Sequence, residues 1–399
     1  MAKVKPLTRL DSYRLVRYVL LLFYVQSILV GFTAQVYDST KNRIYTSKIL
    51  AFYSIGISII LIIKHITSGN LIGRNSELGV VESTVNAVEA FLLLNIMLLG
   101  TIRRYTMRKN MEGLFDDYAN IQKVIGFTSS QIYGTANIRV MRAAMIGTAL
   151  LLILILPDLR IVTSLSEVFD VFTFMYPKVM IVNLASWQYL EVLYVHRYLE
   201  LINHMLSEMH YEAAKEVKVI NLDKNFQSLS LKLFRIMMIR NRVIALAFKI
   251  NNNNNLQMLT VFTLISVLTL NQMYAVFLLI HHLSQDQIEA SQQKSLSSIF
   301  CLILILYEAF CITDACEQVM EESNKTSEIL HRYNSLHMDA QLKQTVEMFL
   351  IQLMHHPIKF TACGMFTLDY SVLFSIITSA TSYLIILIQF ELADNCRKG

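Results

Sequence analysis

The hydrophobic residues of this chain are gathered into eight long blocks separated by more polar connections. The blocks cover residues 15–36, 48–66, 80–102, 139–156, 168–194, 256–280, 297–315 and 369–390. An α-helix needs about 20 mostly apolar residues to cross a bilayer, and these blocks approach that length. Three polar connections, 196–214, 225–249 and 317–355, carry apolar residues at three-to-four spacing, which predicts helices that extend the spans. The pattern predicts an all-α membrane protein.

Composition agrees with this fold class. The 399 residues are 54% hydrophobic and only 16% charged, whereas soluble domains are about 25% charged. The net charge is +5, and the basic residues are not clustered with aromatic residues, which argues against a nucleic-acid partner. The five cysteines show no paired spacing, so neither a disulfide framework nor a cysteine metal site is expected. The expected environment is the lipid bilayer.

The distribution of Lys and Arg predicts the orientation of the spans. Basic residues gather in the connections that follow blocks 80–102, 168–194 and 297–315, and such connections face the cytoplasm. If all eight blocks crossed, the basic N-terminal residues would lie outside. The first block is interrupted by Gln26, Gly31 and Gln35, which fits a half-buried helix that does not cross. We therefore expect seven transmembrane helices in an inverted topology, with the N-terminus cytoplasmic and the C-terminus extracellular.

This topology divides the chain into seven parts. We expect a cytoplasmic segment with a non-spanning apolar helix (1–47), spans 1–4 (48–195), a cytoplasmic helical anchor (196–255), spans 5–6 (256–315), a cytoplasmic helical segment (316–368), span 7 (369–390) and an extracellular tail (391–399). Residues 251–255 are five consecutive asparagines, which are unfavourable in a helix. We expect a helix break there, and its ordinary interpretation is a flexible joint.

The last span carries small polar residues at helical spacing. Ser371, Ser375, Thr378, Ser382, Ile385 and Gln389 fall on a single stripe. Hydroxyl groups followed by an amide suit a helix that borders a water-filled pore. Equally, small residues let membrane helices pack closely. Periodicity alone gives the two interpretations similar weight.

Two further groups of residues in the spans suggest sites. Glu89 and Lys178 lie at similar predicted depths, which favours a structural ion pair over a contact with a ligand.

The outer halves of spans 4 and 5 are rich in aromatic and amide side chains, and the pocket candidates among them are Phe172, Tyr176, Asn271, Gln272 and Tyr274. Apolar walls with a few polar groups are typical of a small-molecule pocket. Aromatic residues also form belts at membrane interfaces, and that alternative remains open.

The sequence contains no motif typical of catalysis or of a bound cofactor. It has no Gly-rich phosphate loop, no GxSxG and no HExxH. The adjacent pairs His281–His282 and His355–His356 point to different helix faces, so neither forms an i, i+4 metal pair. We expect neither an enzyme nor a metal or cofactor site.

The end of the last span resembles the signature of the insect gustatory receptor family. That signature is Thr-Tyr, five hydrophobic residues and Gln-Phe at the end of the seventh span. Tyr383, Gln389 and Phe390 match it in type and spacing, and Ser382 replaces Thr with the hydroxyl retained. Length near 400, the pre-span apolar segment and the long cytoplasmic stretch between spans 4 and 5 are similar as well.

The resemblance implies a chemoreceptor that works as a ligand-gated, nonselective cation channel, related to insect odorant receptors. Such receptors assemble as tetramers, so the partners would be a small-molecule tastant, permeant cations and either identical subunits or other gustatory receptors. The seventh helices would line the pore, with Thr378, Ser382 and Ile385 along it and Gln389 and Phe390 at the gate. The expected location is the plasma membrane of sensory neurons, at their dendrites, and the match to Gln-Phe favours a bitter or otherwise aversive compound.

Two other classes of seven-span or multi-span protein stay as alternatives. A G-protein-coupled receptor would need an extracellular N-terminus, which the basic connections oppose. A transporter fold often shows internal repeats and helices broken by Gly or Pro, and the sequence shows neither.

Overall fold

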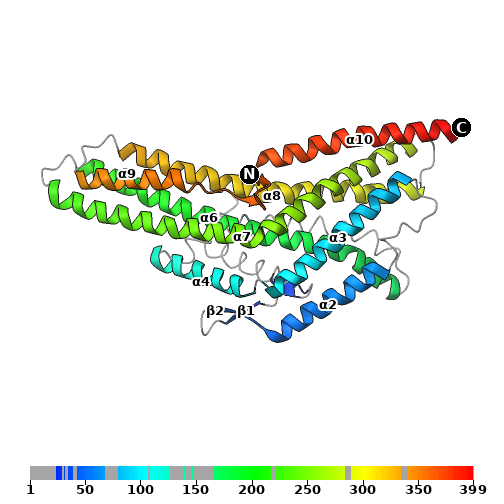
Figure 1. Cartoon of the computed structure of the whole chain (residues 1–399), viewed down its shortest axis with the longest axis horizontal. Coiled ribbons are helices and arrows are strands. Elements are labelled where there is room, and N and C mark those ends of the chain that lie inside the picture. Colours follow the sequence, from blue (N-terminus) through cyan, green and yellow to red (C-terminus); the bar gives the residue numbers. More distant parts are fainter. Residues whose placement is uncertain are drawn as a thin grey trace, which may run out of the picture.

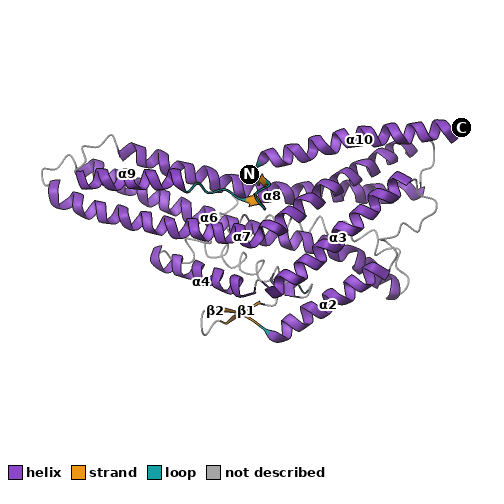
Figure 2. Ribbon diagram, in the orientation of Figure 1, coloured by secondary structure: helices purple, strands orange, loops and turns teal. Residues whose placement is uncertain are grey.

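The structure is a computed structural model of the chain, and it consists mostly of long helices (Figures 1 and 2). It describes residues 24–28, 31, 35–38, 43–67, 80–106, 108–125, 139, 146, 165–216, 222–283, 289–333 and 340–398. The helices in these ranges are α2 (Lys48–Thr67), α3 (Val80–Thr106), α4 (Arg108–Ile125), α6 (Leu165–Glu216), α7 (Leu222–Leu283), α8 (Glu289–Tyr333), α9 (Ala340–His355) and α10 (Tyr370–Lys398).

The three longest helices, α6, α7 and α8, pack on one another and run along most of the molecule (Figure 1). Toward one end they are joined by α4 and α9, and this part is called the anchor half. Toward the other end they are joined by α2, α3 and α10, and this part is called the span half (Figure 1). The two halves therefore share continuous helices.

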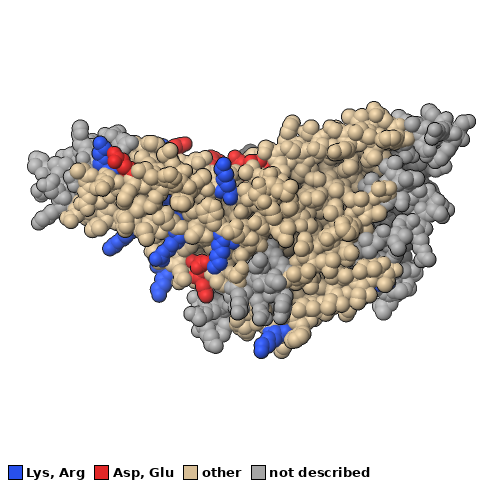
Figure 3. Space-filling model, in the orientation of Figure 1, with Lys and Arg blue, Asp and Glu red and all other residues tan. Residues whose placement is uncertain are grey.

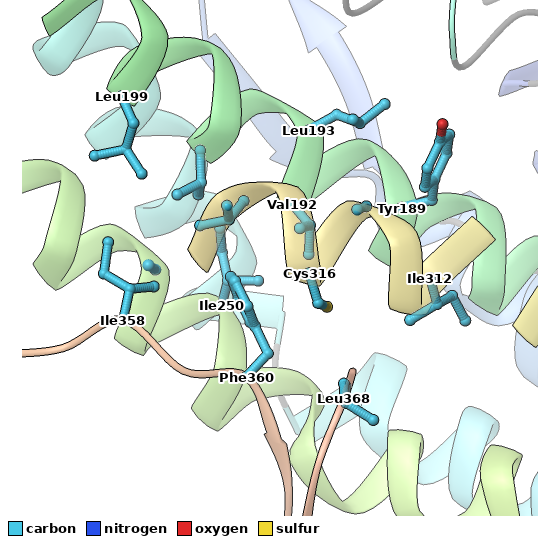
Figure 4. Close-up of a cluster of buried hydrophobic side chains, with 14 of the residues drawn as sticks. Tyr189, Val192, Leu193, Leu199, Ile250, Ile312, Cys316, Ile358, Phe360 and Leu368 are labelled. Carbon is cyan, nitrogen blue, oxygen red and sulfur yellow. The ribbon is translucent and has the colours of Figure 1, made fainter. Parts of the chain in front are cut away.

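The hydrophobic core is largest where α6, α7 and α8 meet the segment that leads into α10. Figure 4 shows Tyr189, Val192, Leu193 and Leu199 of α6, Ile250 of α7, Ile312 and Cys316 of α8, and Ile358, Phe360 and Leu368 of that segment. Ile250, Cys316 and Ile312 are completely inaccessible to solvent. This core holds the start of α10 against the long helices.

The predicted spans agree with the observed helices wherever the chain is described. Blocks 48–66 and 80–102 correspond to α2 and α3, blocks 168–194, 256–280 and 297–315 lie inside α6, α7 and α8, and block 369–390 corresponds to α10. Within the described residues, three helical segments are long and apolar enough to cross a membrane: Gln227–Phe277, Ile299–Tyr333 and Tyr370–Phe390. Almost all of block 139–156 lies outside the described residues. The predicted extensions at 196–214 and 225–249 are confirmed as helical parts of α6 and α7.

The first apolar block is not one helix up to Val36, contrary to the prediction. Residues 24–28 are helical, Gly31 then turns with a φ of 72°, and strand β1 (Gln35–Asp38) pairs antiparallel with β2 (Arg43–Thr46). A φ in the left-handed region suits glycine, which has no Cβ to clash with the backbone. The main-chain oxygen of Gly31 accepts a hydrogen bond from Ser54 of α2, so this turn is fixed against the next helix.

The helix break expected at the five asparagines is also wrong, because α7 continues through residues 251–255 without interruption. The amide of Asn251 accepts a hydrogen bond from the main-chain nitrogen of Thr361 at 2.9 Å. The Nδ2 of Asn254 donates to Glu191 of α6 at 2.6 Å. Asparagine disfavours helices because its amide competes for local backbone groups. Here two of the amides are occupied by distant partners, and tertiary contacts override the weak propensity.

Charged side chains lie mainly over the anchor half. On the face shown in Figure 3, the described Lys, Arg, Asp and Glu residues gather over the anchor half, whereas the part formed by α3 and α10 shows almost none. A surface with few charges suits contact with lipid or with other apolar surfaces. This uneven distribution agrees with a molecule of which only one half is embedded in a membrane.

Candidate functional site: the helix α10 and its base

The polar stripe of α10 lies on the side of the helix that faces away from the rest of the subunit. Ser371, Ser375, Thr378, Ser382, Ile385 and Gln389 are all exposed. The buried residues of the helix are Ile376 and Ala380, at 7% and 3% exposure, where α10 packs along α7 and α8. Ala380 is nine residues after Ser371, which is two and a half helical turns, so the stripe and the packed side are diametrically opposed.

Three hydroxyl groups of α10, those of Ser375, Thr381 and Ser382, donate to main-chain oxygens one turn earlier in the same helix. Ser375 donates to the main-chain oxygen of Ser371 at 2.8 Å, and Ser382 donates to that of Thr378 at 3.0 Å. A hydroxyl oxygen keeps lone pairs after it has donated. Ser375 and Ser382 therefore present acceptors rather than donors to whatever lies beside the stripe, which is a suitable lining for cations.

The base of α10 is fixed by a helix cap and by a contact with α8. The Oδ1 of Asp369 accepts a hydrogen bond from the main-chain nitrogen of Ser371 at 2.9 Å, the geometry of an N-cap. Burial opposes ionisation of Asp369, but hydrogen bonds from Ser371 and Thr367 outweigh it and lower the pKa of this carboxyl. The hydroxyl of Tyr370 donates to Asp314 of α8 at 2.6 Å. The sequence had placed Asp369 inside the span, whereas it marks the point where the helix begins.

A small hairpin precedes this cap and joins α9 to α10. Strand β3 (Thr361–Ala362) pairs with β4 (Phe366–Thr367). The turn between them places Cys363 and Gly364 at φ values of 51° and 71°, and the main-chain nitrogen of Met365 donates to the oxygen of Ala362 at 3.0 Å. The hairpin is bonded to Asn251 of α7 through Thr361, so the start of α10 is tied to both long neighbours.

The four signature residues lie on the exposed surface of α10 within the subunit. Ser382, Tyr383, Gln389 and Phe390 are all exposed, and Tyr383 and Phe390 are 59% and 63% accessible. These residues are thus available to a neighbouring chain or to lipid.

The pocket candidates contact different partners in the structure. Tyr176 of α6 is buried, and its hydroxyl lies 3.4 Å from Ser58 of α2. Asn271 of α7 donates to Glu89 of α3. Tyr274 is buried and stacks on Phe277 of its own helix, with ring centroids 6.5 Å apart. Gln272 is partly buried on α7, and the side chain of Phe172 lies outside the described residues.

Glu89, a candidate for an ion pair, accepts a hydrogen bond from Asn271, a candidate for the pocket. Lys178 of α6 is partly buried in the same bundle. An ion pair between Glu89 and Lys178 therefore stays a prediction. The hydrogen bond to Asn271 could not be read from the sequence, since it depends on the rotation of α7 against α3.

Comparison with known proteins gives the family. The sequence model described as "7tm Chemosensory receptor" matches residues 14–394. Putative gustatory receptor 28b of Drosophila melanogaster is 37% identical over 89 residues, which are 22% of this chain and 19% of that protein. Gustatory receptor for bitter taste 22e of the same fly is 24% identical over 208 residues, 52% of this chain and 50% of that protein. The alignments with these relatives thus span half of their length or less.

Solved structures show the same fold over nearly the whole chain. The insect olfactory receptor OR5 from Machilis hrabei superposes with a TM-score of 0.67 at 13% identity, covering 95% of this chain and 100% of that one. The same receptor in complex with eugenol gives a TM-score of 0.68 at 13% identity, covering 96% and 99%. The family model spans almost all of the sequence, and this chain therefore belongs to the 7tm chemosensory receptor family.

Proposed function

We propose that this chemosensory receptor is a gustatory receptor subunit that forms a ligand-gated cation channel, with α10 lining the pore. Four subunits, either identical or mixed with other gustatory receptors, place their α10 helices around one axis. The N-terminus and the anchor half lie in the cytoplasm, and the C-terminus lies outside. The receptor acts in the plasma membrane of sensory neurons, at their dendrites.

The observation that carries the proposal is the placement of the polar stripe opposite the packed side of α10. A hydroxyl-bearing stripe that served only close helix packing would face α7 or α8, because small residues act by letting neighbouring backbones approach. The buried positions of α10 are instead Ile376 and Ala380. The stripe is therefore available to contact water or other subunits. In a pore shared by several subunits it would contact both.

The ligand is proposed to be a small, bitter or otherwise aversive molecule. Two of the relatives are described as receptors for bitter taste, and the OR5 structure contains eugenol, a small molecule. The proposed pocket lies in the span half near Tyr176, Asn271 and Tyr274. Ligand binding opens the channel only if it is tighter in the open state. The contact between Tyr370 and Asp314 is the proposed route by which movement of α8 reaches α10.

Cysteine accessibility in α10 tests the pore directly. The background carries Cys363→Ser and Cys396→Ser, because Cys396 lies in the proposed extracellular tail and would react with the same reagent. In this background, Ser382→Cys is compared with Ala380→Cys, its matched control on the packed side. A charged methanethiosulfonate reagent is applied outside cells that express the receptor, and ligand-evoked current is recorded. We expect the reagent to reduce the current of Ser382→Cys by more than half and to leave Ala380→Cys unchanged.

The opposite pattern would contradict the pore assignment. Modification at position 380 without modification at 382 would place the packed side of α10 in water. Labelling of neither position in a channel that still conducts would move the pore to another helix. Ligand-driven uptake of substrate without channel-sized current would favour a transporter instead.

A further inference from the structure

A cavity between α3 and α7 is lined by none of the residues of the proposed tastant pocket. Its volume is about 290 Å³, and one wall is formed by Ile96 and Leu99 of α3 and by Leu256 and Val261 of α7. Asn252, Asn253 and Asn255 also line it. The lining of the cavity thus combines apolar side chains with residues of the five-asparagine run.

Asn253 is the one asparagine of the run whose side-chain amide nitrogen is buried without a hydrogen-bond partner among the described residues. The residue is 9% exposed, and its Nδ2 has no hydrogen-bond partner among the described residues. The neighbouring amides of Asn251 and Asn254 are bonded to Thr361 and Glu191. A buried donor without a partner is costly, so a native structure normally supplies one. Asn253 lines the cavity, so a turn of its amide brings the donor to an acceptor held there.

The cavity lies where the charged part of the molecule meets the apolar part. Lys249, three residues before Asn252, forms an ion pair with Asp117 of α4 at 2.6 Å. Three residues correspond to a rise of about 4.5 Å along a helix. On the other side of the amides, α7 continues through Leu256 and Val261 toward the span half. A molecule in the cavity would therefore have its polar group at the level of the membrane boundary and its apolar part among the spans.

The lining determines the class of the occupant. Among the described residues that line the cavity none is charged, and Lys249 already has its counterion. A neutral polar group therefore fits better than a phosphate or an ammonium group, which would be desolvated without a partner. The volume is at the lower end of small-molecule pockets, too small for a whole phospholipid with two chains.

We propose that this cavity binds a neutral, membrane-partitioned amphiphile, an aliphatic chain ending in a hydroxyl group, whose oxygen accepts a hydrogen bond from Nδ2 of Asn253. The apolar chain lies between α3 and α7. The site is separate from the proposed tastant pocket and from the pore. Its occupancy does not depend on channel activity.

Photolabelling of the full-length receptor in lipid nanodiscs tests the site. The probe is dodecanol carrying a mid-chain diazirine, and its control is the dodecane analogue without the hydroxyl. After illumination, labelled residues are identified by mass spectrometry. We expect the alcohol to label α3 at 96–102 and α7 at 252–261 at least tenfold more than the hydrocarbon does.

Two variants test the hydrogen bond from Asn253 and the position of the probe in the cavity. Asn253→Leu removes the donor and is expected to lower labelling by the alcohol about tenfold while labelling by the hydrocarbon is unchanged. Thr260→Phe fills the cavity, which Thr260 lines, and is expected to abolish labelling by both probes. Its matched control is Thr263→Phe, since Thr263 is an exposed residue of the same helix that also donates to its own i−4 carbonyl.

The results that overturn the proposal are equally definite. Equal labelling by alcohol and hydrocarbon would mean that any bilayer chain enters the groove and that the amide selects nothing. Labelling that survives Thr260→Phe but is lost in Thr263→Phe would place the probe on the outer surface of α7. Labelling by the alcohol that is unaffected by Asn253→Leu would exclude the proposed hydrogen bond.

Discussion

Replacing Asn203 by leucine should disrupt a buried hydrogen-bond network in the anchor half. Asn203 of α6 is 4% exposed, and its Nδ2 donates to both the main-chain oxygen and the Oε1 of Glu322 in α8, each at 2.8 Å. Its Oδ1 accepts a hydrogen bond from Thr326 at 2.7 Å. Leucine has a similar size, so the change removes polar partners without opening a large cavity.

The magnitude follows from the groups that lose their partners. The carboxylate of Glu322 loses a charge-assisted hydrogen bond, worth about 1.5–3 kcal/mol. The carbonyl of Glu322 and the hydroxyl of Thr326 lose one each, but these two lie 3.5 Å apart and can bond to each other. Together they add about 1–2 kcal/mol. We expect the free energy of unfolding to fall by about 2.5–5 kcal/mol.

Thermal denaturation of detergent-solubilised, fluorescently tagged receptor, followed by size-exclusion chromatography, measures this effect. At about 2 °C per kcal/mol, the midpoint should fall by about 5–10 °C. Asn324→Leu is the matched control, because Asn324 is exposed on the same turn of α8. Exposed substitutions usually change stability by less than about 0.5 kcal/mol, so its midpoint should stay within about 1 °C.

A double-mutant cycle separates the network from a general effect of leucine. Thr326→Val alone should cost about 1 kcal/mol. In combination with Asn203→Leu it should add about half of that or less, because the bond between the two side chains is already lost and only the weak bond to Glu322 remains. Equal midpoints for Asn203→Leu and Asn324→Leu would refute the reasoning. Additive effects of Asn203→Leu and Thr326→Val would also refute it.

Three further predictions concern other parts of the molecule. Burial lowers the pKa of His196, although Glu200 and Glu322 oppose the shift. The pKa of this residue in the folded state therefore lies below its unfolded value of 6.5, so protonation favours the unfolded state. The free energy of unfolding should fall as the pH drops below about 6.5. His196→Gln should reduce the loss of thermal midpoint between pH 7.5 and pH 5.5, and an unchanged loss would exclude this residue as its source. Gln389→Ala should alter ion permeation or gating while surface biotinylation shows normal expression, and currents identical to the unmodified receptor would count against the gate. Asn251→Ala should lower the free energy of unfolding by about 1–2 kcal/mol, because its hydrogen bonds to the hairpin are lost. Asn252→Ala, at an exposed position, should be close to neutral in the same thermal assay. Similar midpoints for the two variants would contradict a stabilising role for the bonds of Asn251.

The five-asparagine run shows where reasoning from the sequence fails. Asparagine is a poor helix former, so the run predicted a break, yet α7 passes through it as a continuous helix. Thr361 is 110 residues away from Asn251, and Glu191 is 63 residues away from Asn254. Local propensity contains no information about such partners. The same limit explains why the bond between Tyr370 and Asp314 was not foreseen.

The sequence by itself determined the helices of the span half and the family. Long apolar blocks must bury their backbone polar groups within helices when water is absent, so their length and position predict α2, α3 and α10 to within a few residues at the starts. The polar stripe of α10 was also visible, because helical periodicity is a local property. The signature at Ser382, Tyr383, Gln389 and Phe390 pointed to a family that the comparison over residues 14–394 supports.

Only the tertiary structure decided which side of each helix is buried. The rotation of α10 places Ala380 against its neighbours and Ser382 on the open side, and this choice depends on the combined packing of α7, α8 and the hairpin at 361–367. It also left the donor of Asn253 beside an apolar cavity while the neighbouring amides found partners. Packing is a property of several surfaces together, and a periodic pattern in one segment specifies only one of them.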